Sequence, residues 1–214
     1  MSALSKKPAK AKLIATLMAL DEKLIKSALS ALEPMFGPVE LLSSIFPFTY
    51  SDYYKREMGD TLLKVFCSFG TLIEPDEIVS LKLSALETER KFLITTPPEA
   101  VLEDTGGSLP RSAPGDDDRV SGTSQQVAAE WRVGRTVNID PGYLDGMKLV
   151  LATTKDCSHR IYLGKGIYGD VELMYRSGSF VCLEWTYLDY REPFAVEFFN
   201  RVRGEYLAEL RSAR

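Results

Sequence analysis

Short apolar runs and stretches of helical spacing alternate along the first part of the chain. Leu13 to Leu20 is an unbroken apolar run, which is typical of a strand buried on both faces. From Asp21 to Phe36, apolar residues recur every three or four positions, which predicts an amphipathic helix. Gly37 and Pro38 follow at once and mark the end of that helix.

A second set of strands and a second helix follow. Val39 to Phe48 is a predicted strand, and so is Leu62 to Ile73, which is rich in β-branched and aromatic residues. Pro75 fits the first turn of a helix, and the acidic residues after it suit the positive end of the helix dipole. We therefore expect a helix from Pro75 to about Phe92.

The second half of the chain has the pattern of a β-meander. Gly164-Lys165-Gly166 is a clear hairpin turn between two apolar runs, and Ser177-Gly178 is a second turn. Pro193 opens a last amphipathic helix. The strands expected in this half are 135–139, 159–163, 167–175 and 180–187.

The order of these elements indicates an α+β fold. Strand-helix-strand-strand-helix-strand suggests a ferredoxin-like antiparallel sheet with helices on one face. We expect the C-terminal β-meander and a final helix to extend that sheet. A chain of 214 residues has the size of one domain. We predict a disordered basic tail over residues 1–11 and a single domain over residues 12–214.

A polar segment interrupts the predicted domain near its middle. Residues 97–126 are rich in Pro, Gly, Ser and Asp, and such a composition cannot bury enough apolar surface to order itself. Six acidic and two basic residues in this segment account for the whole formal net charge of -4. We therefore predict a flexible acidic insert in a neutral body. A neutral body argues against nucleic acid and anionic membranes as partners.

The cysteine and histidine content bears on the compartment and on metal binding. Cys67, Cys157 and Cys182 are odd in number and widely spaced, which favours free thiols in a reducing compartment such as the cytoplasm. With His159 as the sole histidine, we expect no metal site, and the pattern assigns no cofactor. No apolar run approaches the about 20 residues of a membrane span, and we expect no signal peptide.

Polar residues that could bind an anion gather between Val137 and Tyr175. Lysine, arginine and histidine side chains near carboxylates can hold a phosphate or carboxylate group. The aromatic segment from Phe46 to Tyr54 is a second candidate region, because its rings could line a pocket or a partner surface. The candidate ligand-binding residues are Asp140, Tyr143, Lys148, Lys155, His159, Arg160 and Glu172, joined from the aromatic segment and its flank by Asp52, Tyr54 and Glu57.

Both regions also have a purely structural interpretation. Arg160, Glu172 and Glu184 could form cross-strand ion pairs on the polar face of the sheet. His159 could be a hydrogen-bonded histidine at the edge of the core. The aromatic segment could simply pack the edge of the sheet. The sequence alone leaves these alternatives open.

The common nucleotide-binding and catalytic motifs are missing. The chain has no G-x-x-x-x-G-K-[ST] phosphate loop and no G-x-S-x-G nucleophile elbow. Gly164 to Gly169 reads literally as G-x-G-x-x-G. It falls in a predicted hairpin rather than in a strand-to-helix turn, so its context does not fit dinucleotide binding.

Three separated groups of motifs carry a resemblance to a known family. In chain order they are Phe46-Pro47-Phe48 with Asp52-Tyr53-Tyr54 and Glu57-Met58-Gly59; the stretch from Val137-Asn138-Ile139-Asp140-Pro141-Gly142-Tyr143 through His159-Arg160-Ile161-Tyr162-Leu163 to Gly166-Ile167-Tyr168; and Glu184-Trp185-Thr186-Tyr187 with Asp189-Tyr190. The combination resembles the bacterial family designated domain of unknown function 4416. Its members are sometimes labelled GTP-binding proteins, yet Thr154-Lys155-Asp156 lacks the N-K-x-D spacing of guanine recognition.

Two functional hypotheses follow. The first is a protein that binds a small anion bearing phosphate or carboxylate, either as an enzyme or as a binding protein. It predicts that the candidate side chains converge in one concave pocket. The second is a non-catalytic module that binds a protein partner or forms a homodimer through the aromatic segment and the polar face of the sheet.

Overall fold

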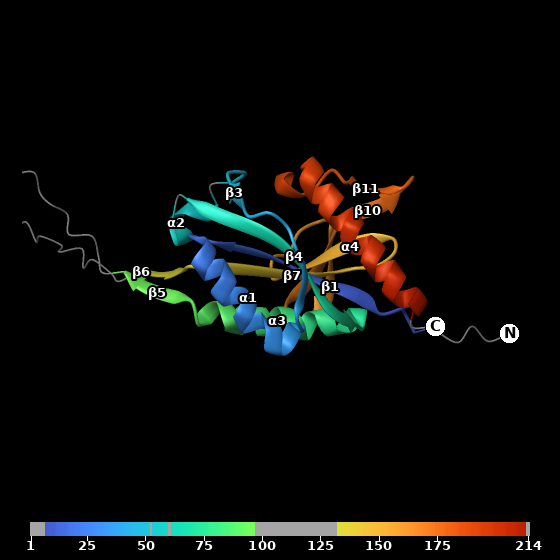
Figure 1. Cartoon of the computed structure of the whole chain (residues 1–214). Helices are drawn as coiled ribbons and strands as arrows, with labels where there is room; N and C mark the ends of the chain where they lie inside the picture. Colours follow the sequence, from blue (N-terminus) through green and yellow to red (C-terminus); the bar gives the residue numbers. More distant parts are fainter. Residues whose placement is uncertain (1–6, 52, 60, 97–131, 213–214) are drawn as a thin grey trace, which may run out of the picture.

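The protein folds around one large antiparallel sheet (Figure 1). The computed structural model describes residues 7–51, 53–59, 61–96 and 132–212. The predicted acidic insert, residue Asp52 and the first six residues of the predicted tail lie outside this part of the chain. Two short strands, β5 (Leu93–Thr96) and β6 (Arg132–Arg135), pair with each other beside the sheet.

Nine strands make up the large sheet, and every pairing in it is antiparallel. They are β1 (Ala11–Ala19), β2 (Val39–Leu42), β3 (Phe46–Phe48), β4 (Leu62–Ile73), β7 (Val137–Leu144), β8 (Lys148–Thr153), β9 (Arg160–Gly164), β10 (Ile167–Arg176) and β11 (Ser179–Cys182). The order is β11-β10-β8-β7-β1-β4-β2, with β3 beside β4 and β9 beside β10. The inner part, with β1 between β4 and β7, confirms the ferredoxin-like arrangement, and the later strands extend it.

The helices begin and end where capping residues allow. They are α1 (Glu22–Phe36), α2 (Lys55–Met58), α3 (Ile78–Arg90) and α4 (Pro193–Ser212), with short 3-10 turns η1 (Pro75–Glu77) and η2 (Leu188–Arg191). The Asp21 carboxylate caps α1 by accepting the Leu24 N–H at 2.8 Å. Gly37 ends α1 with a φ of 85°, and a Cβ there would lie 2.0 Å from Thr71 Oγ1. Only glycine fits that position.

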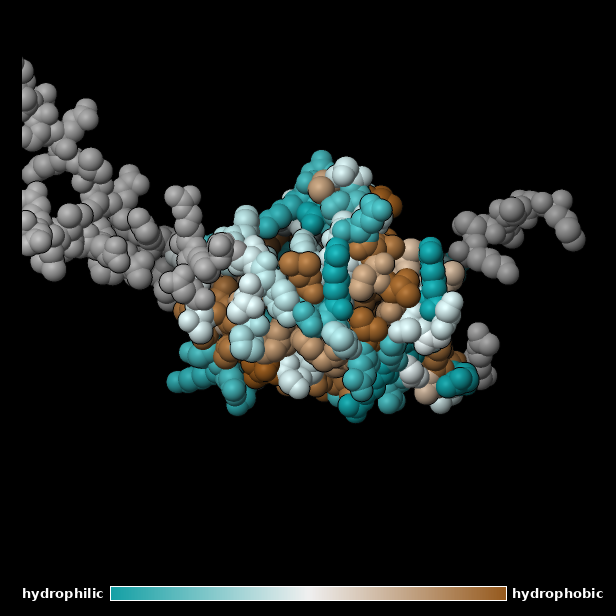
Figure 2. Space-filling view, turned by 90° about the horizontal axis from the view of Figure 1, so that it is seen from above, coloured by the Kyte–Doolittle hydropathy of each residue, from teal (hydrophilic) through white to brown (hydrophobic). Residues whose placement is uncertain are grey.

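Two apolar cores lie on opposite faces of the sheet. Leu13 and Leu17 of β1 pack with α1 and α3 on one face, and Ile14 packs with α4 on the other. The first strand is therefore buried on both faces, as its unbroken apolar run predicts. The sequence left the face of the final helix unspecified, and the structure places α4 opposite α1 and α3 (Figure 1). In the view from above, hydrophilic side chains break the apolar surface into patches (Figure 2).

Several element bounds differ from the sequence prediction, each for a local reason. The strand expected over 39–48 is divided into β2 and β3, because the Ser43 hydroxyl accepts the Phe66 N–H and interrupts the regular ladder. The strand expected over 180–187 ends at Cys182, where the Leu183 N–H turns to the Thr186 hydroxyl. Strand β8 was not predicted separately within the meander.

Both predicted turns of the meander are confirmed. Lys165 and Gly166 have φ values of 52° and 76°, and Ser177 and Gly178 have φ values of 50° and 94°. Two successive residues with positive φ are the signature of the two-residue turn that matches the twist of antiparallel strands. The hairpins therefore hold β9, β10 and β11 in a fixed register.

None of the described helices is long and apolar enough to cross a membrane.

The sheet splits between β7 and β8. These strands pair only from Gly142 to Leu144, whereas the first five residues of β7 pair with β1 alone. Two side chains of α3 replace the missing neighbour at Ile139: Glu89 accepts the Ile139 N–H at 2.6 Å, and Lys82 donates to the Ile139 carbonyl at 2.9 Å. Buried backbone groups need such partners. The split remains open because these two side chains form the hydrogen bonds that a neighbouring strand would otherwise make with Ile139.

Candidate functional site

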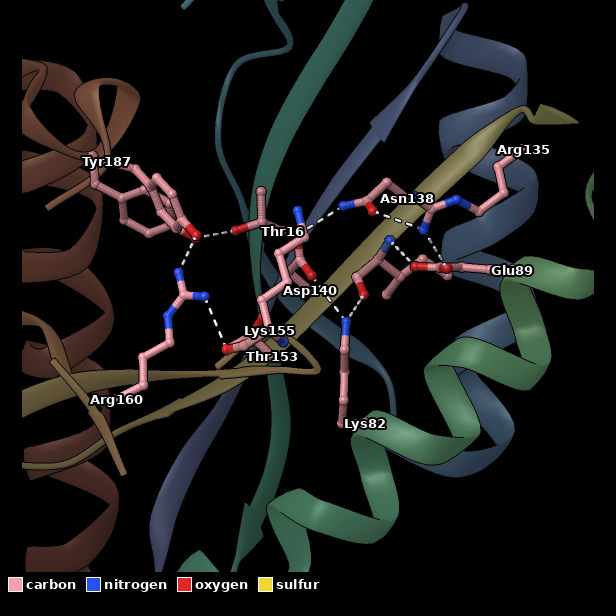
Figure 3. Close-up of polar contacts among 12 residues, drawn as sticks. Thr16, Lys82, Glu89, Arg135, Asn138, Asp140, Thr153, Lys155, Arg160 and Tyr187 are labelled. Carbon is pink, nitrogen blue, oxygen red and sulfur yellow. Dashed lines mark hydrogen bonds and ion pairs between the residues drawn. The ribbon is translucent and has the colours of Figure 1, made fainter. Parts of the chain in front are cut away.

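A cavity of about 360 Å³ lies where β7 and β8 separate. Strands β1, β4, β7, β8 and β10 contribute to its wall together with α3, the aromatic segment and the η2 turn. Its charged and polar lining residues are Ser51, Lys64, Lys82, Arg135, Asn138, Asp140, Thr153, Thr154, Lys155, Asp170 and Asp189, and its aromatic lining residues are Phe48, Tyr53, Tyr54, Tyr187 and Tyr190. Figure 3 shows that many of the polar groups point toward one another from different elements.

Asp140 is held in the cavity by two buried side chains. Lys82 Nζ donates to Asp140 Oδ1 at 2.9 Å, and Asn138 Nδ2 donates to Asp140 Oδ2 at 2.7 Å (Figure 3). Burial by itself raises the pKa of Asp140, but the Lys82 charge and these two hydrogen bonds outweigh burial and lower that pKa. Asp140 is therefore an ionised carboxylate in a fixed position at neutral pH.

Arg135 connects Asp140, through Asn138, to Glu57 of α2. Its guanidinium forms a two-pronged ion pair with Glu57, at 2.6 and 2.9 Å, and contacts Glu89 at 2.8 Å. It also donates to Asn138 Oδ1 at 3.2 Å. The hydrogen bonds to Glu57 raise the pKa of Arg135, and the same ion pair lowers the pKa of Glu57. This network fixes α2 and β7 relative to each other.

A second network forms the opposite wall. Arg160 donates to Asp170 Oδ2 at 2.8 Å, to the Lys155 carbonyl at 3.0 Å and to the Tyr187 hydroxyl at 2.7 Å. Burial raises the pKa of Tyr187 to about 12, so its phenol is neutral. Because the phenol oxygen accepts from Arg160, the Tyr187 hydrogen is left to donate elsewhere. His159 lies 3.4 Å from Asp170 Oδ2 and stacks on Trp185, outside the cavity lining.

Glu172 is fully buried next to this wall. Burial raises its pKa to about 8, even though one oxygen accepts the Tyr187 N–H. Its Oε2 has no hydrogen-bond partner among the described residues. Glu172 is therefore a protonated acid at neutral pH that supports the η2 turn rather than an ionised group of the cavity.

In the described part of the chain, no three His, Cys, Asp or Glu side chains are grouped as a metal site requires.

Lys155 differs from the other cations of the cavity. Lys64, Lys82 and Arg135 each form an ion pair with a carboxylate, the Lys64 pair with Asp189 being 2.5 Å long. Among the described residues, no carboxylate lies within ion-pair distance of Lys155. Its Nζ instead lies 3.8 Å from the centre of the Tyr53 ring. The lysine can therefore turn to an incoming anion without breaking an existing ion pair.

The structure brings together only part of the predicted candidate set. Asp140, Tyr54 and Lys155 line the cavity, while Glu57, Arg160, His159 and Glu172 contact its lining from behind. Two others lie elsewhere. Tyr143 packs against the α1 and α3 core, and Lys148 pairs with Asp145 at the far end of β8. Asp52 is outside the described residues.

Sequence reasoning missed several residues that define the site. Lys82 falls within the predicted helix from Pro75 to about Phe92, and Lys64 falls within the predicted strand from Leu62 to Ile73. A charged residue inside an otherwise apolar strand was the one available signal for Lys64, since such a residue is buried only with a partner. Asn138 and Tyr187 appeared within the family motifs, but no role could be assigned to them. No pattern in the sequence indicates that Lys82 reaches the unpaired edge of β7.

The comparisons with known proteins agree with the motifs. The family model described as a domain of unknown function, DUF4416, matches residues 9–97 and 119–206. The matched segments contain the residues that line the cavity. No curated protein and no solved structure gives a significant match. Because the family model covers most of the chain, the protein belongs to the DUF4416 family.

Proposed function

We propose that the cavity binds a small organic anion bearing phosphate or carboxylate. The observation that carries this proposal is Lys155, a cation of the cavity wall that forms no ion pair with a described carboxylate. The Tyr187 hydroxyl, which receives a hydrogen bond from Arg160, is a second donor in the cavity lining. An ammonium and a neutral phenol together suit the oxygens of an anion.

The rest of the cavity fits the body of such a ligand. A volume of about 360 Å³ lies at the lower end of the range for ligand pockets, which run from about 300 to about 1,000 Å³. Phe48, Tyr53 and Tyr54 supply an aromatic wall whose neighbouring rings meet edge to face. Most of the remaining charges are already paired, so the site selects by shape and by a few hydrogen bonds. The expected ligand is a small metabolite rather than a polymer.

Thermal-shift and calorimetric titrations with inorganic phosphate and succinate test this proposal. We expect at least one of the two anions to raise the Tm of the wild-type protein. Lys155→Met should weaken binding about 10- to 100-fold, because it removes a charged hydrogen-bond donor. Lys148→Met is the matched control, since it removes the same charge from a lysine outside the cavity. Equal affinity in all three proteins would contradict the assignment of Lys155.

A second candidate function is formation of a homodimer through β9. In the described sheet, β9 pairs with β10 alone, and Ile161, Tyr162 and Leu163 are 67%, 60% and 40% exposed. An open edge with exposed apolar side chains favours pairing with another strand. A second copy running antiparallel about Tyr162 would place Ile161 opposite Leu163, so the strand is complementary to itself.

Light scattering after size-exclusion chromatography tests this second candidate. The wild-type protein should have the mass of a dimer at about 100 µM, and Ile161→Lys should convert it to a monomer. Leu42→Lys is the matched control and should leave the dimer intact, because Leu42 is an exposed residue of β2 at the opposite edge of the sheet. A wild-type protein that remains monomeric would eliminate β9 as a dimer interface.

A further inference from the structure

The position of Asp140 restricts the class of ligand further. We propose that the ligand carries hydroxyl groups in addition to its anionic group, as a phosphorylated sugar or polyol does, and that Asp140 accepts hydrogen bonds from these hydroxyls. This inference rests on the proposed anion site at Lys155 and adds a second contact to it. Its basis is the exposure and the hydrogen bonding of the Asp140 carboxylate.

Asp140 has unused acceptor capacity in the cavity. Each carboxylate oxygen receives one hydrogen bond from the protein, from Lys82 at Oδ1 and from Asn138 at Oδ2. A carboxylate oxygen has about two lone-pair sites, so each oxygen can accept one more donor. The side chain lines the cavity and is 33% exposed, whereas those of Asp170 and Asp189 are 2% and 3% exposed. Asp140 is therefore the accessible carboxylate of the lining.

The protein holds this carboxylate in one orientation before a ligand arrives. Lys82 is 3% exposed and Asn138 is 7% exposed, and Asn138 is itself fixed by Arg135. A binding group that is already oriented loses little conformational entropy when the ligand binds. Two oxygens with fixed directions suit a pair of neighbouring hydroxyl groups. Such preorganisation distinguishes Asp140 from a surface carboxylate.

Charge determines which end of the ligand faces Asp140. An ionised carboxylate repels a phosphate or a second carboxylate, so the anionic group of the ligand is expected at the Lys155 ammonium rather than beside Asp140. The end that meets Asp140 must instead donate hydrogen bonds through O–H or N–H groups. Hydroxyl and amino sugars share this chemistry. A monosaccharide phosphate combines both kinds of end within a size that the cavity of about 360 Å³ can hold.

Calorimetric titration with four probes tests the inference. The probes are inorganic phosphate, n-hexyl phosphate, glucose 6-phosphate and glucosamine 6-phosphate. We expect glucose 6-phosphate to bind wild-type protein about 10- to 100-fold more tightly than n-hexyl phosphate, since hydrogen bonds to a charged group are strong. A further gain with glucosamine 6-phosphate would identify an amino group as the preferred donor. The wild-type comparison decides the matter even if a variant fails to fold.

Asp140→Asn gives a signature that a structural role would not produce. The substitution should remove most of the advantage of glucose 6-phosphate over n-hexyl phosphate. It should leave inorganic phosphate binding unchanged or make it tighter, because a repelling negative charge is removed. Lys155→Met, in contrast, should weaken the binding of all four probes.

The two proposals fail in different ways. If neither these four phosphates nor succinate binds, the anion site itself is refuted. If the phosphates bind through Lys155 but glucose 6-phosphate has no advantage in the wild-type protein, the anion site stands and the role of Asp140 is refuted. A loss of inorganic phosphate binding in folded Asp140→Asn would likewise count against the hydroxyl contact.

Discussion

Replacing Lys82 with Met is the sharpest test of how the sheet is kept open. Lys82 is almost fully buried and makes two hydrogen bonds of 2.9 Å, to the Ile139 carbonyl and to Asp140. Methionine keeps the apolar stem but leaves both acceptors without their donor. Breaking a fully buried ion pair costs about 3–5 kcal/mol. Because Asp140 is one-third exposed to the cavity and can be hydrated, we expect about 2–3 kcal/mol.

The cost of Lys82→Met should depend on pH. In the wild-type protein the pKa of Asp140 is lowered on folding, so its ionisation contributes stability above the unfolded pKa, and this contribution is lost as the pH falls through the folded pKa. Without Lys82, burial dominates and the pKa of Asp140 rises. Glu89 changes in the same direction, because burial already raises its pKa and the Lys82 charge opposes that effect. The destabilisation should therefore be largest near pH 7 and smaller near pH 4.

Urea denaturation of both proteins at pH 7 and pH 4 measures this difference. Lys148→Met is the control, because the Lys148 ion pair with Asp145 is exposed and should contribute at most about 1 kcal/mol. The double variant Lys82→Met with Asp140→Asn should be less destabilised than the sum of the single changes. A loss below about 1 kcal/mol that is equal at both pH values would refute the account of the split sheet.

Three further changes test other parts of the structure. Lys12→Met should lower the free energy of unfolding by about 2 kcal/mol, because the fully buried Lys12 ammonium pairs with Glu40 and Glu209. Urea denaturation that shows no loss of stability would contradict this prediction. Wild-type stability should fall as the pH rises from about 4.5 to 8, because the folded pKa of Glu172 is about 8, and Glu172→Gln should remove roughly 2 kcal/mol of that fall between pH 5 and 7. An unchanged pH profile in denaturation experiments would show that Glu172 is ionised in the fold. Gly142→Ala should cost about 2 kcal/mol, since its Cβ would lie 2.4 Å from the Val150 carbonyl oxygen where β7 and β8 meet; an unchanged Tm would disprove this close approach.

Local patterns determined most of the elements. The unbroken run in β1, the capping Asp21 and Gly37, and the turns at Lys165-Gly166 and Ser177-Gly178 are consequences of neighbouring residues. Their order was enough to predict the ferredoxin-like arrangement, because few topologies accommodate it. Where a bound was wrong, as at Ser43, a side chain had replaced a backbone partner, and hydrophobic periodicity does not register such an exchange.

The candidate site could be predicted only where its residues lie together in the sequence. The polar stretch identified Asp140 and Lys155, and the aromatic segment identified Tyr54, all of which line the cavity. The polar stretch also suggested Tyr143 and Lys148, which lie outside the cavity. Periodicity assigns a residue to a face of its own strand, but it does not predict where that strand lacks a paired neighbour.

The sequence by itself determined the α+β class, the order of the main elements in the ferredoxin-like part and the two hairpin turns, because these depend on patterns among residues near in the chain. Only the tertiary structure decided that β7 and β8 separate and that Lys82 reaches Asp140 from a helix 58 residues away in sequence. Pairing between distant strands depends on how the whole sheet packs and twists. The cavity therefore exists because long-range packing leaves one ladder incomplete, and buried side chains from α3 complete it.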